Sequence, residues 1–163
     1  MFKVGDLLIY PTQGLAEVQG IEKKSINGTQ VDFYILEIVS KGLAIMVPTA
    51  NEAKIGLRKV VDKEQIQKVK EILSHPSENR YSQWHHRYTD NSEKLKSGSI
   101  FMTAEVLRDL YLIKQKKNLA IKESRMMDNA MQLLVSEIAA AKGISEKEAT
   151  HSIRESLAKL ENT

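Results

Sequence analysis

The sequence predicts an α+β protein, with a small, strongly bent β-sheet or barrel of Tudor or SH3 type followed by an all-helical domain of about five helices. Two observations predict this class. Over the first sixty residues, apolar and polar residues alternate in short runs, and after Asp62 apolar residues recur at the three- and four-residue spacing of helices. The change of period near residue 60 predicts one domain over residues 1–60 and another over residues 61–163.

The first half of the chain contains four or five short segments typical of strands. Residues 7–10 end at Pro11, as a strand does when it meets a residue without a backbone N–H, and residues 43–47 end at Pro48 in the same way. Residues 15–21 and 31–39 also read as strands. Between them lies Asn27-Gly28, a pair that tolerates the two positive φ angles of a type I′ hairpin turn.

The second half contains five helical segments. Asp62 and Gln65 form a capping-box pair before the first helix, which Pro76 ends. Further helices are expected at about residues 80–96, 101–117 and 121–142, and a last one after the Ser145–Glu148 pair. The apolar stripe of the second helix consists of Tyr81, Trp84, Tyr88 and Leu95.

Composition and charge indicate in which compartment the protein works and which kinds of partner it can bind. The chain has no cysteine, which excludes disulfides and thiolate metal sites. Its charged N-terminus does not resemble a signal peptide and no apolar run approaches a membrane span, so we expect a cytoplasmic protein without membrane contact. Residues 1–62 carry 7 Lys+Arg against 7 Asp+Glu, whereas residues 81–125 carry 9 against 5. This excess permits an anionic partner without requiring one.

No motif of catalysis or cofactor binding stands out. His85 and His86 are adjacent, so on a helix they point about 100° apart and do not chelate one ion easily. The chain has no HExxH, no P-loop, no GxGxxG and no GxSxG motif. We therefore expect no enzyme activity, no cofactor and no metal site.

Trp84, the only tryptophan, has three interpretations. It fills the interface between its own helix and the helix of residues 101–117, as its stripe with two tyrosines allows. Alternatively, with Arg87 one turn away, the ring stacks on or wedges between bases while the cation holds a phosphate. It also suits a protein–protein hot spot. Spacing alone leaves the three open.

A series of short motifs runs in order from residue 2 to about residue 160. It comprises FKVGDLLIYPTQGLAEVQGIE, then IMVP at 45–48, GLRKV at 56–60, WHHRY at 84–88, EKLKSG at 93–98 and AEVLRDLY at 104–111. In combination, these motifs resemble the CarD/CdnL family of bacterial transcription regulators. Because it lacks an acidic, HMGA-like tail, the sequence resembles the shorter, CdnL-type members of this family.

The resemblance implies a function for each domain. It implies that residues 1–60 form a Tudor-like domain, also found in the transcription-repair coupling factor, that binds the RNA polymerase β subunit. The helical domain is then expected to touch promoter DNA at the upstream edge of the melted bubble, where Trp84 wedges into the minor groove and stabilises the open complex. The implied polymerase contacts are Lys24, Ile26, Leu36, Met46 and Pro48. The implied DNA contacts are Trp84, His85, His86, Arg87, Tyr88 and Arg125, in a protein expected to be monomeric.

The chain departs from the family pattern at several of these positions. Some relatives carry Arg where this chain has Met46, so a charged contact becomes an apolar one. After the tryptophan, relatives commonly have two arginines, a tyrosine and another basic residue, whereas this chain has His86 and Thr89 at two of these positions. Ser124 stands where relatives tend to have Arg. We therefore expect weaker, more pH-dependent DNA binding, and an adaptor on RNA polymerase without direct DNA contact is the alternative. A small metal-dependent enzyme comes third.

Overall fold

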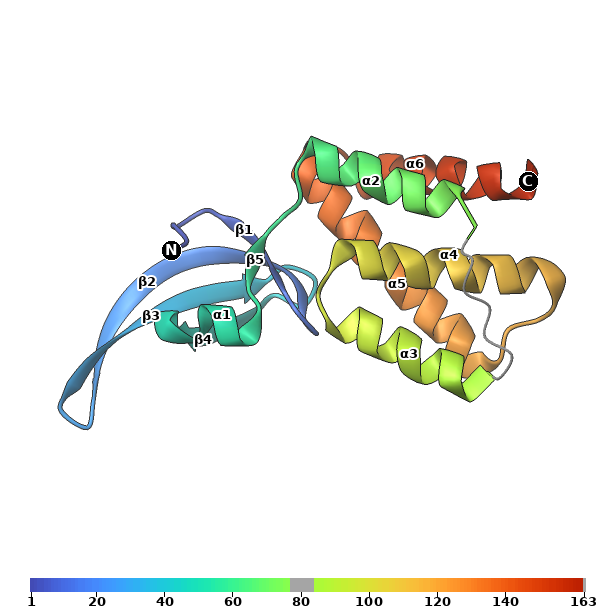
Figure 1. Cartoon of the computed structure of the whole chain (residues 1–163). Helices are drawn as coiled ribbons and strands as arrows, with labels where there is room; N and C mark the ends of the chain where they lie inside the picture. The colour runs from blue at the N-terminus through green and yellow to red at the C-terminus, as the bar shows by residue number, and fades with distance from the viewer. Residues whose placement is uncertain (77–83, 163) are drawn as a thin grey trace. The chain divides into compact units, whose positions relative to one another are not determined.

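The structure, a computed structural model, describes residues 1–76 and 84–162. The chain divides into two units, Met1–Val60 and Val61–Thr163, and each is described here by itself. The first unit is built on an antiparallel sheet and the second on helices (Figure 1). The predicted α+β class is therefore confirmed. Among the described residues, no helix is long and apolar enough to span a membrane.

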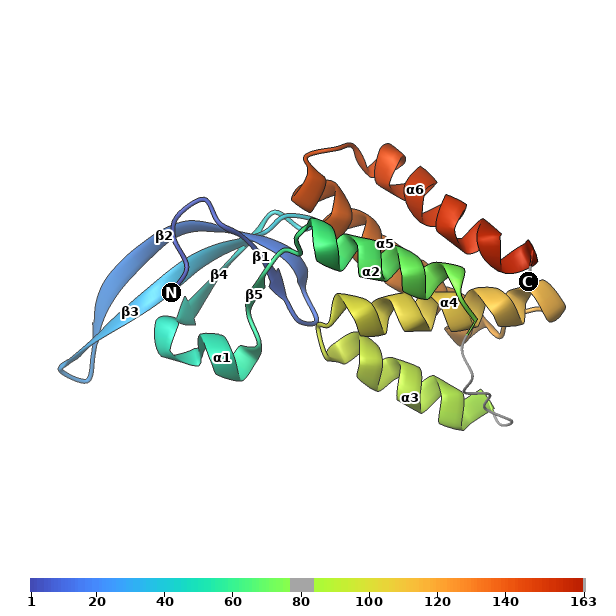
Figure 2. The same ribbon diagram turned by 45° about the horizontal axis from the view of Figure 1, so that its top comes forward.

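The first unit contains one five-stranded antiparallel sheet. Its strands are β1 (Leu7–Tyr10), β2 (Gly14–Ile26), β3 (Thr29–Ile38), β4 (Leu43–Pro48) and β5 (Arg58–Lys59), in the spatial order β4-β3-β2-β1-β5. The long β2–β3 hairpin is visibly curved (Figure 2). Its register shifts between Val18 and Gly20, and such a bulge bends a strand. The predicted Asn27-Gly28 turn is confirmed, with φ angles of 52° and 79°.

One face of this sheet forms the core of the first unit. The cluster consists of Leu8, Ala16, Val18, Tyr34, Leu36, Ile38, Val47 and Leu57. The helices η1 (Thr49–Asn51) and α1 (Glu52–Ile55) follow β4, and Ile55 packs on the same cluster. The Tyr34 hydroxyl donates to Glu52 Oε2 at 2.5 Å and accepts from the Phe2 N–H at 3.2 Å. Burial, followed by the bond to Glu52, raises the pKa of Tyr34. This side chain ties the N-terminus and α1 to β3.

In its described residues, the second unit contains five α-helices. They are α2 (Lys63–Ser74), α3 (Trp84–Lys96), α4 (Ile100–Lys116), α5 (Ile121–Lys142) and α6 (Glu146–Ala158), followed by η2 (Lys159–Asn162). The predicted capping box is confirmed: Asp62 Oδ1 accepts the Gln65 N–H at 2.9 Å, and Gln65 Oε1 accepts the Asp62 N–H at 3.0 Å. Ser145 Oγ caps α6 through the Glu148 N–H at 3.1 Å. Tyr81, part of the predicted stripe of the second helix, lies outside the described residues.

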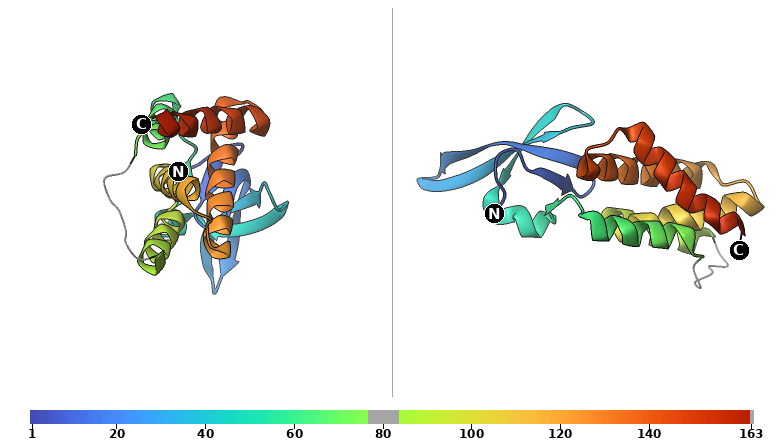
Figure 3. Two further views of the ribbon diagram at one scale, coloured as in Figure 1. Left: turned by 90° about the vertical axis from the view of Figure 1, so that its right-hand side faces the viewer. Right: turned by 90° about the horizontal axis from the view of Figure 1, so that it is seen from above.

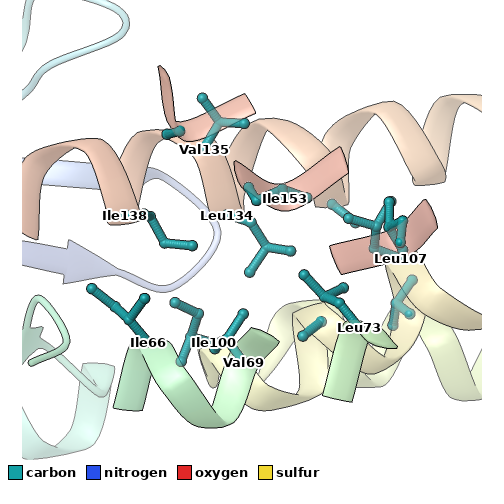
Figure 4. Packing of buried hydrophobic residues seen from close by; sticks show 14 of the residues in the cluster. Ile66, Val69, Leu73, Ile100, Leu107, Leu134, Val135, Ile138 and Ile153 are labelled. Atoms are coloured by element: carbon teal, nitrogen blue, oxygen red, sulfur yellow. The ribbon is translucent and has the colours of Figure 1, made fainter. Parts of the chain in front are cut away.

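Four helices build the core of this unit, and α3 lies outside it. Figure 4 shows side chains of α2, α4, α5 and α6 packed together; those labelled are Ile66, Val69, Leu73, Ile100, Leu107, Leu134, Val135, Ile138 and Ile153. By contrast, α3 packs against α4 and α5 on the side opposite α6 (Figures 2 and 3). Of the α3 side chains that are described, residues 86–96, no apolar one is fully buried; Tyr88 and Leu95 pack partly against the core.

Candidate functional site

Four of the five predicted polymerase contacts share one face of the sheet. Directly paired residues of an antiparallel sheet point to the same side, as do residues two apart on one strand. Lys24 pairs with Val31, and Ile26 pairs with Thr29. On the other side of β3, Met46 pairs with Ile35 and Pro48 with Phe33. The face opposite the core, called the outer face below, therefore carries Lys24, Ile26, Val31, Phe33, Ile35, Met46 and Pro48.

The outer face combines exposed apolar side chains with a cation. Met46 is 41% exposed and Ile26 is 46% exposed. The Lys24 ammonium donates to the Met46 sulfur at 3.6 Å, so the cation lies beside the apolar group. In addition, β4 ends the strand order, so among the described strands only β3 pairs with it. Such an edge leaves backbone donors and acceptors available to another chain.

Leu36 does not belong to this face, and its predicted role as a polymerase contact is wrong. Its side chain is 0% exposed and packs in the core beside Tyr34 and Val47. The reason is the alternation of β3, which turns even-numbered residues toward the core. The outward neighbours, Phe33 and Ile35, were missed. Their pairing with Pro48 and Met46 would have identified them, but the pairing depends on strand register.

The predicted DNA contacts lie on the first turns of α3 and α5. α3 begins at Trp84; the side chains of Trp84 and His85 lie outside what the structure describes. His86 is exposed, and Tyr88 is half-buried against the helical core. Arg125 is exposed on α5. These residues come from two helices that lie in contact.

Arg87 is buried, which corrects the expectation that it holds a phosphate. Only 8% exposed, it directs its guanidinium toward Glu123 of α5, with Nη2 2.7 Å and Nε 2.9 Å from Glu123 Oε1. This charge-assisted pair uses two of the five guanidinium donors, and the burial of the group keeps it from a phosphate at the surface. The sequence gives no local signal for the pair, because its partners lie 36 residues apart.

Glu123, the partner of Arg87, is 2% exposed, and its position on α5 stabilises its negative charge at this buried site. It lies in the first turn of the helix, where the helix dipole favours a negative charge. Its neighbours in sequence, Lys122 and Ser124, are exposed. The Arg87–Glu123 pair thus places the first turn of α5, with exposed Lys122 and Arg125, next to the first turn of α3. Lys122 was not predicted as a site residue.

Other polar groups lie on α3 and along α4. Asn91, one turn after Arg87, is 2% exposed, and its Nδ2 has no hydrogen-bond partner among the described residues. Lys94 Nζ lies 3.7 Å from Glu105 Oε2 of α4. Further along α4, Arg108 Nε donates to Asp109 Oδ1 at 3.0 Å. Burial raises the pKa of Asp109, although the charge of Arg108 opposes that shift.

Two family models divide the chain between them. The CarD-like/TRCF RID domain matches residues 2–61, and the CarD C-terminal domain matches residues 68–154. The chain belongs to the CarD family. A relative in Bacillus subtilis (strain 168), described as the putative transcription factor YdeB, is 34% identical over 148 residues, which cover 91% of this chain and 97% of that protein. The solution structure of the 72-residue N-terminal domain of Myxococcus xanthus CarD is also similar, with 34% identity over 36% of this chain and 79% of that one, and a TM-score of 0.32.

CarD family membership establishes the general role of the chain. It is a transcription regulator whose N-terminal Tudor-like domain interacts with RNA polymerase. The CarD family is a family of transcription factors rather than of enzymes. Among the residues that the structure describes, no three His, Asp or Glu side chains are grouped so as to hold a metal ion.

Proposed function

We propose that this CarD-family chain binds the β subunit of RNA polymerase through the outer face and stabilises the open promoter complex through the first turns of α3 and α5. It acts as a monomer, contacting promoter DNA in the minor groove at the upstream edge of the bubble. The single observation that carries the proposal is the convergence of Lys24, Ile26, Met46 and Pro48, predicted from the resemblance, on one uncovered face of the sheet.

The composition of the outer face supports a protein partner. Because Met46 and Ile26 are 41% and 46% exposed, burying the rest of each side chain in an interface gains roughly 0.6–1.4 kcal/mol. Lys24 adds a cation at the rim, which favours an acidic group opposite. The edge of β4 adds backbone groups that a strand of the partner can pair with. Together, these features support recruitment by the first unit.

The chemistry of the helical site supports a DNA contact that is weak without recruitment. Residues 81–125 carry 9 Lys+Arg against 5 Asp+Glu, and one of these cations, Arg87, forms an ion pair with Glu123. His86, Lys122 and Arg125 remain as exposed groups beside the helix that begins at Trp84. Few phosphate contacts mean a shallow salt dependence, on the order of 2–4 in the logarithmic slope. We propose that Trp84 wedges against an unstacked base step and that the exposed cations contact the phosphates on either side of it.

The decisive experiment is the lifetime of the open complex with Trp84→Ala. Stacking of an aromatic ring on a base is worth about 1–3 kcal/mol, so its loss shortens the half-life roughly 5- to 150-fold. Binding to a β fragment stays unchanged, and so does the melting temperature within a few degrees. Trp84→Phe is the matched control, because it keeps a ring and retains part of the lifetime. A stable Trp84→Ala protein with a wild-type half-life contradicts the DNA contact.

The burial of Arg87 favours one other function, an adaptor that binds RNA polymerase without touching DNA. In that case the outer face still recruits the chain, and the helical unit binds a further protein. The same measurement separates the two functions. An adaptor predicts that Trp84→Ala leaves the half-life of the open complex unchanged and that substitutions on the outer face abolish every effect on transcription.

A further inference from the structure

The fully buried contacts of the described part of α3 are polar, whereas its apolar side chains Tyr88 and Leu95 are only partly buried. Among residues 86–96, the fully buried side chains are those of Arg87 and Asn91, four residues apart and therefore on one face of the helix. Asn91 Nδ2 has no partner among the described residues, so this donor adds no hydrogen bond to the attachment. The Lys94–Glu105 pair is longer, at 3.7 Å, and partly exposed. Within residues 86–96, the Arg87–Glu123 pair is therefore the fully buried ion pair that joins α3 to α5, next to the partial packing of Tyr88 and Leu95.

Arg87 follows Trp84 by three residues, or about 4.5 Å along a helix. Its anchor, Glu123, belongs to α5, which contributes Met126, Ala130 and Leu134 to the rigid core. The ion pair thus connects the turn that starts at Trp84 to the best-packed part of the unit. Both partners are more than nine-tenths buried, so water does not compete effectively for the contact.

We propose that Glu123 is a positioning residue: through Arg87, it fixes the first turn of α3 and so sets the direction in which Trp84 is presented. This inference rests on the proposed function for its effect on DNA, but not for the anchoring itself. Glu123 touches no DNA. Its removal frees the helix end that carries the tryptophan, while the four-helix core remains folded.

The sole tryptophan is an intrinsic probe of this turn in the full-length protein. We expect Glu123→Gln, which leaves Arg87 buried without a counter-charge, to lower the residual fluorescence anisotropy of Trp84 and to shorten the open-complex half-life at least threefold. The double variant Arg87→Met/Glu123→Leu replaces the charges by apolar groups of similar size and leaves no buried charge unpaired, but without the directional pair it is expected to keep both values below those of the wild type. Glu137→Gln is the matched control, since Glu137 is also a buried carboxylate of α5 but bonds the Val61 N–H instead, at 3.0 Å. It is expected to leave the Trp84 anisotropy at the wild-type value.

Three results overturn the inference. In the first, Glu123→Gln leaves the anisotropy unchanged. In the second, Glu137→Gln lowers it equally, which indicates general loosening. In the third, Glu123→Gln frees the tryptophan but keeps a wild-type half-life, although Trp84→Ala shortens it. If Trp84→Ala itself has no effect on the half-life, the proposed function fails, and the anisotropy comparison alone still supports or overturns the anchoring of α3. Should Glu123→Gln fail to fold, the double variant supplies the anisotropy and half-life, and wild-type values for both overturn the inference.

Discussion

The two faces of the sheet permit a sharp test of the proposed polymerase-binding face. Met46→Asp changes an outward side chain that is 41% exposed and 3.6 Å from the Lys24 ammonium. In the free protein the new carboxylate stays in water beside a cation, so the free energy of unfolding changes by only about 0.5 kcal/mol. In the complex, the carboxylate is desolvated in an apolar contact. A penalty of about 2–4 kcal/mol corresponds to a roughly 30- to 1,000-fold rise in Kd.

Leu36→Ala, on the neighbouring strand β3, is the matched change on the opposite face of the same sheet. Leu36 is 0% exposed, and truncating a buried leucine lowers the free energy of unfolding by about 2–5 kcal/mol. Because the side chain does not reach the outer face, the folded fraction binds with the wild-type Kd. The two variants thus separate binding from stability, and each acts on one quantity only.

The assay is a titration of a β-subunit fragment followed by calorimetry, with urea unfolding measured on the same preparations. Wild-type affinity for a folded Met46→Asp protein would place the interface elsewhere. A loss of affinity in Leu36→Ala, measured where at least nine-tenths of the protein is folded, would show that the alternation of β3 does not separate the two roles.

Three further predictions follow from the described geometry. His86→Arg supplies a permanent cation at an exposed position and should lengthen the open-complex half-life, with a steeper salt dependence by about one phosphate; an unchanged slope would contradict it. Burial raises the pKa of Asp109 in the folded protein above its unfolded value of about 3.9. The bound proton therefore stabilises the folded state below about pH 3.9, and this stabilisation is lost as pH rises through the folded pKa. Asp109→Asn should therefore gain stability relative to the wild type between acid and neutral pH in urea unfolding, and a constant difference would refute this. Gly28→Val places a branched residue at a φ of 79° and should cost about 1–2 kcal/mol in the same measurement, whereas Ser25→Val, in the adjoining strand, should not.

Local signals predicted much of the fold. The Asn27-Gly28 turn, the Asp62–Gln65 capping box and the end of α5 at Gly143 each depend on residues within a few positions of one another. Such features were identifiable because the backbone geometry that they require favours few residue types. α1 and β5 were not predicted, since four- and two-residue elements carry no measurable periodicity.

The errors at the candidate site have a different origin. Leu36 and Ile35 are both apolar β-strand residues, and only the pairing of β3 with β4 shows which one points outward. Arg87 is one turn from Trp84 in a basic segment, which favours a surface role. Its burial depends on Glu123, a carboxylate on another helix, and no pattern near residue 87 indicates that partner. Properties set by contacts between distant segments could not be predicted from spacing.

An ion pair at the α3 interface fixes the position of α3 along α5 more specifically than an apolar contact would. If α3 slid by one residue, a leucine at position 87 would remain largely buried, because hydrophobic contacts depend little on direction. Arg87 and Glu123 would instead lose alignment, and a buried charge without its partner costs about 3–5 kcal/mol. The pair therefore specifies a single register of α3 on α5, even if it adds little net stability. A helix that must present one aromatic ring in one direction benefits from this kind of attachment. Under the proposed function, that requirement accounts for a polar contact where the other helices of the unit use leucine, isoleucine and valine.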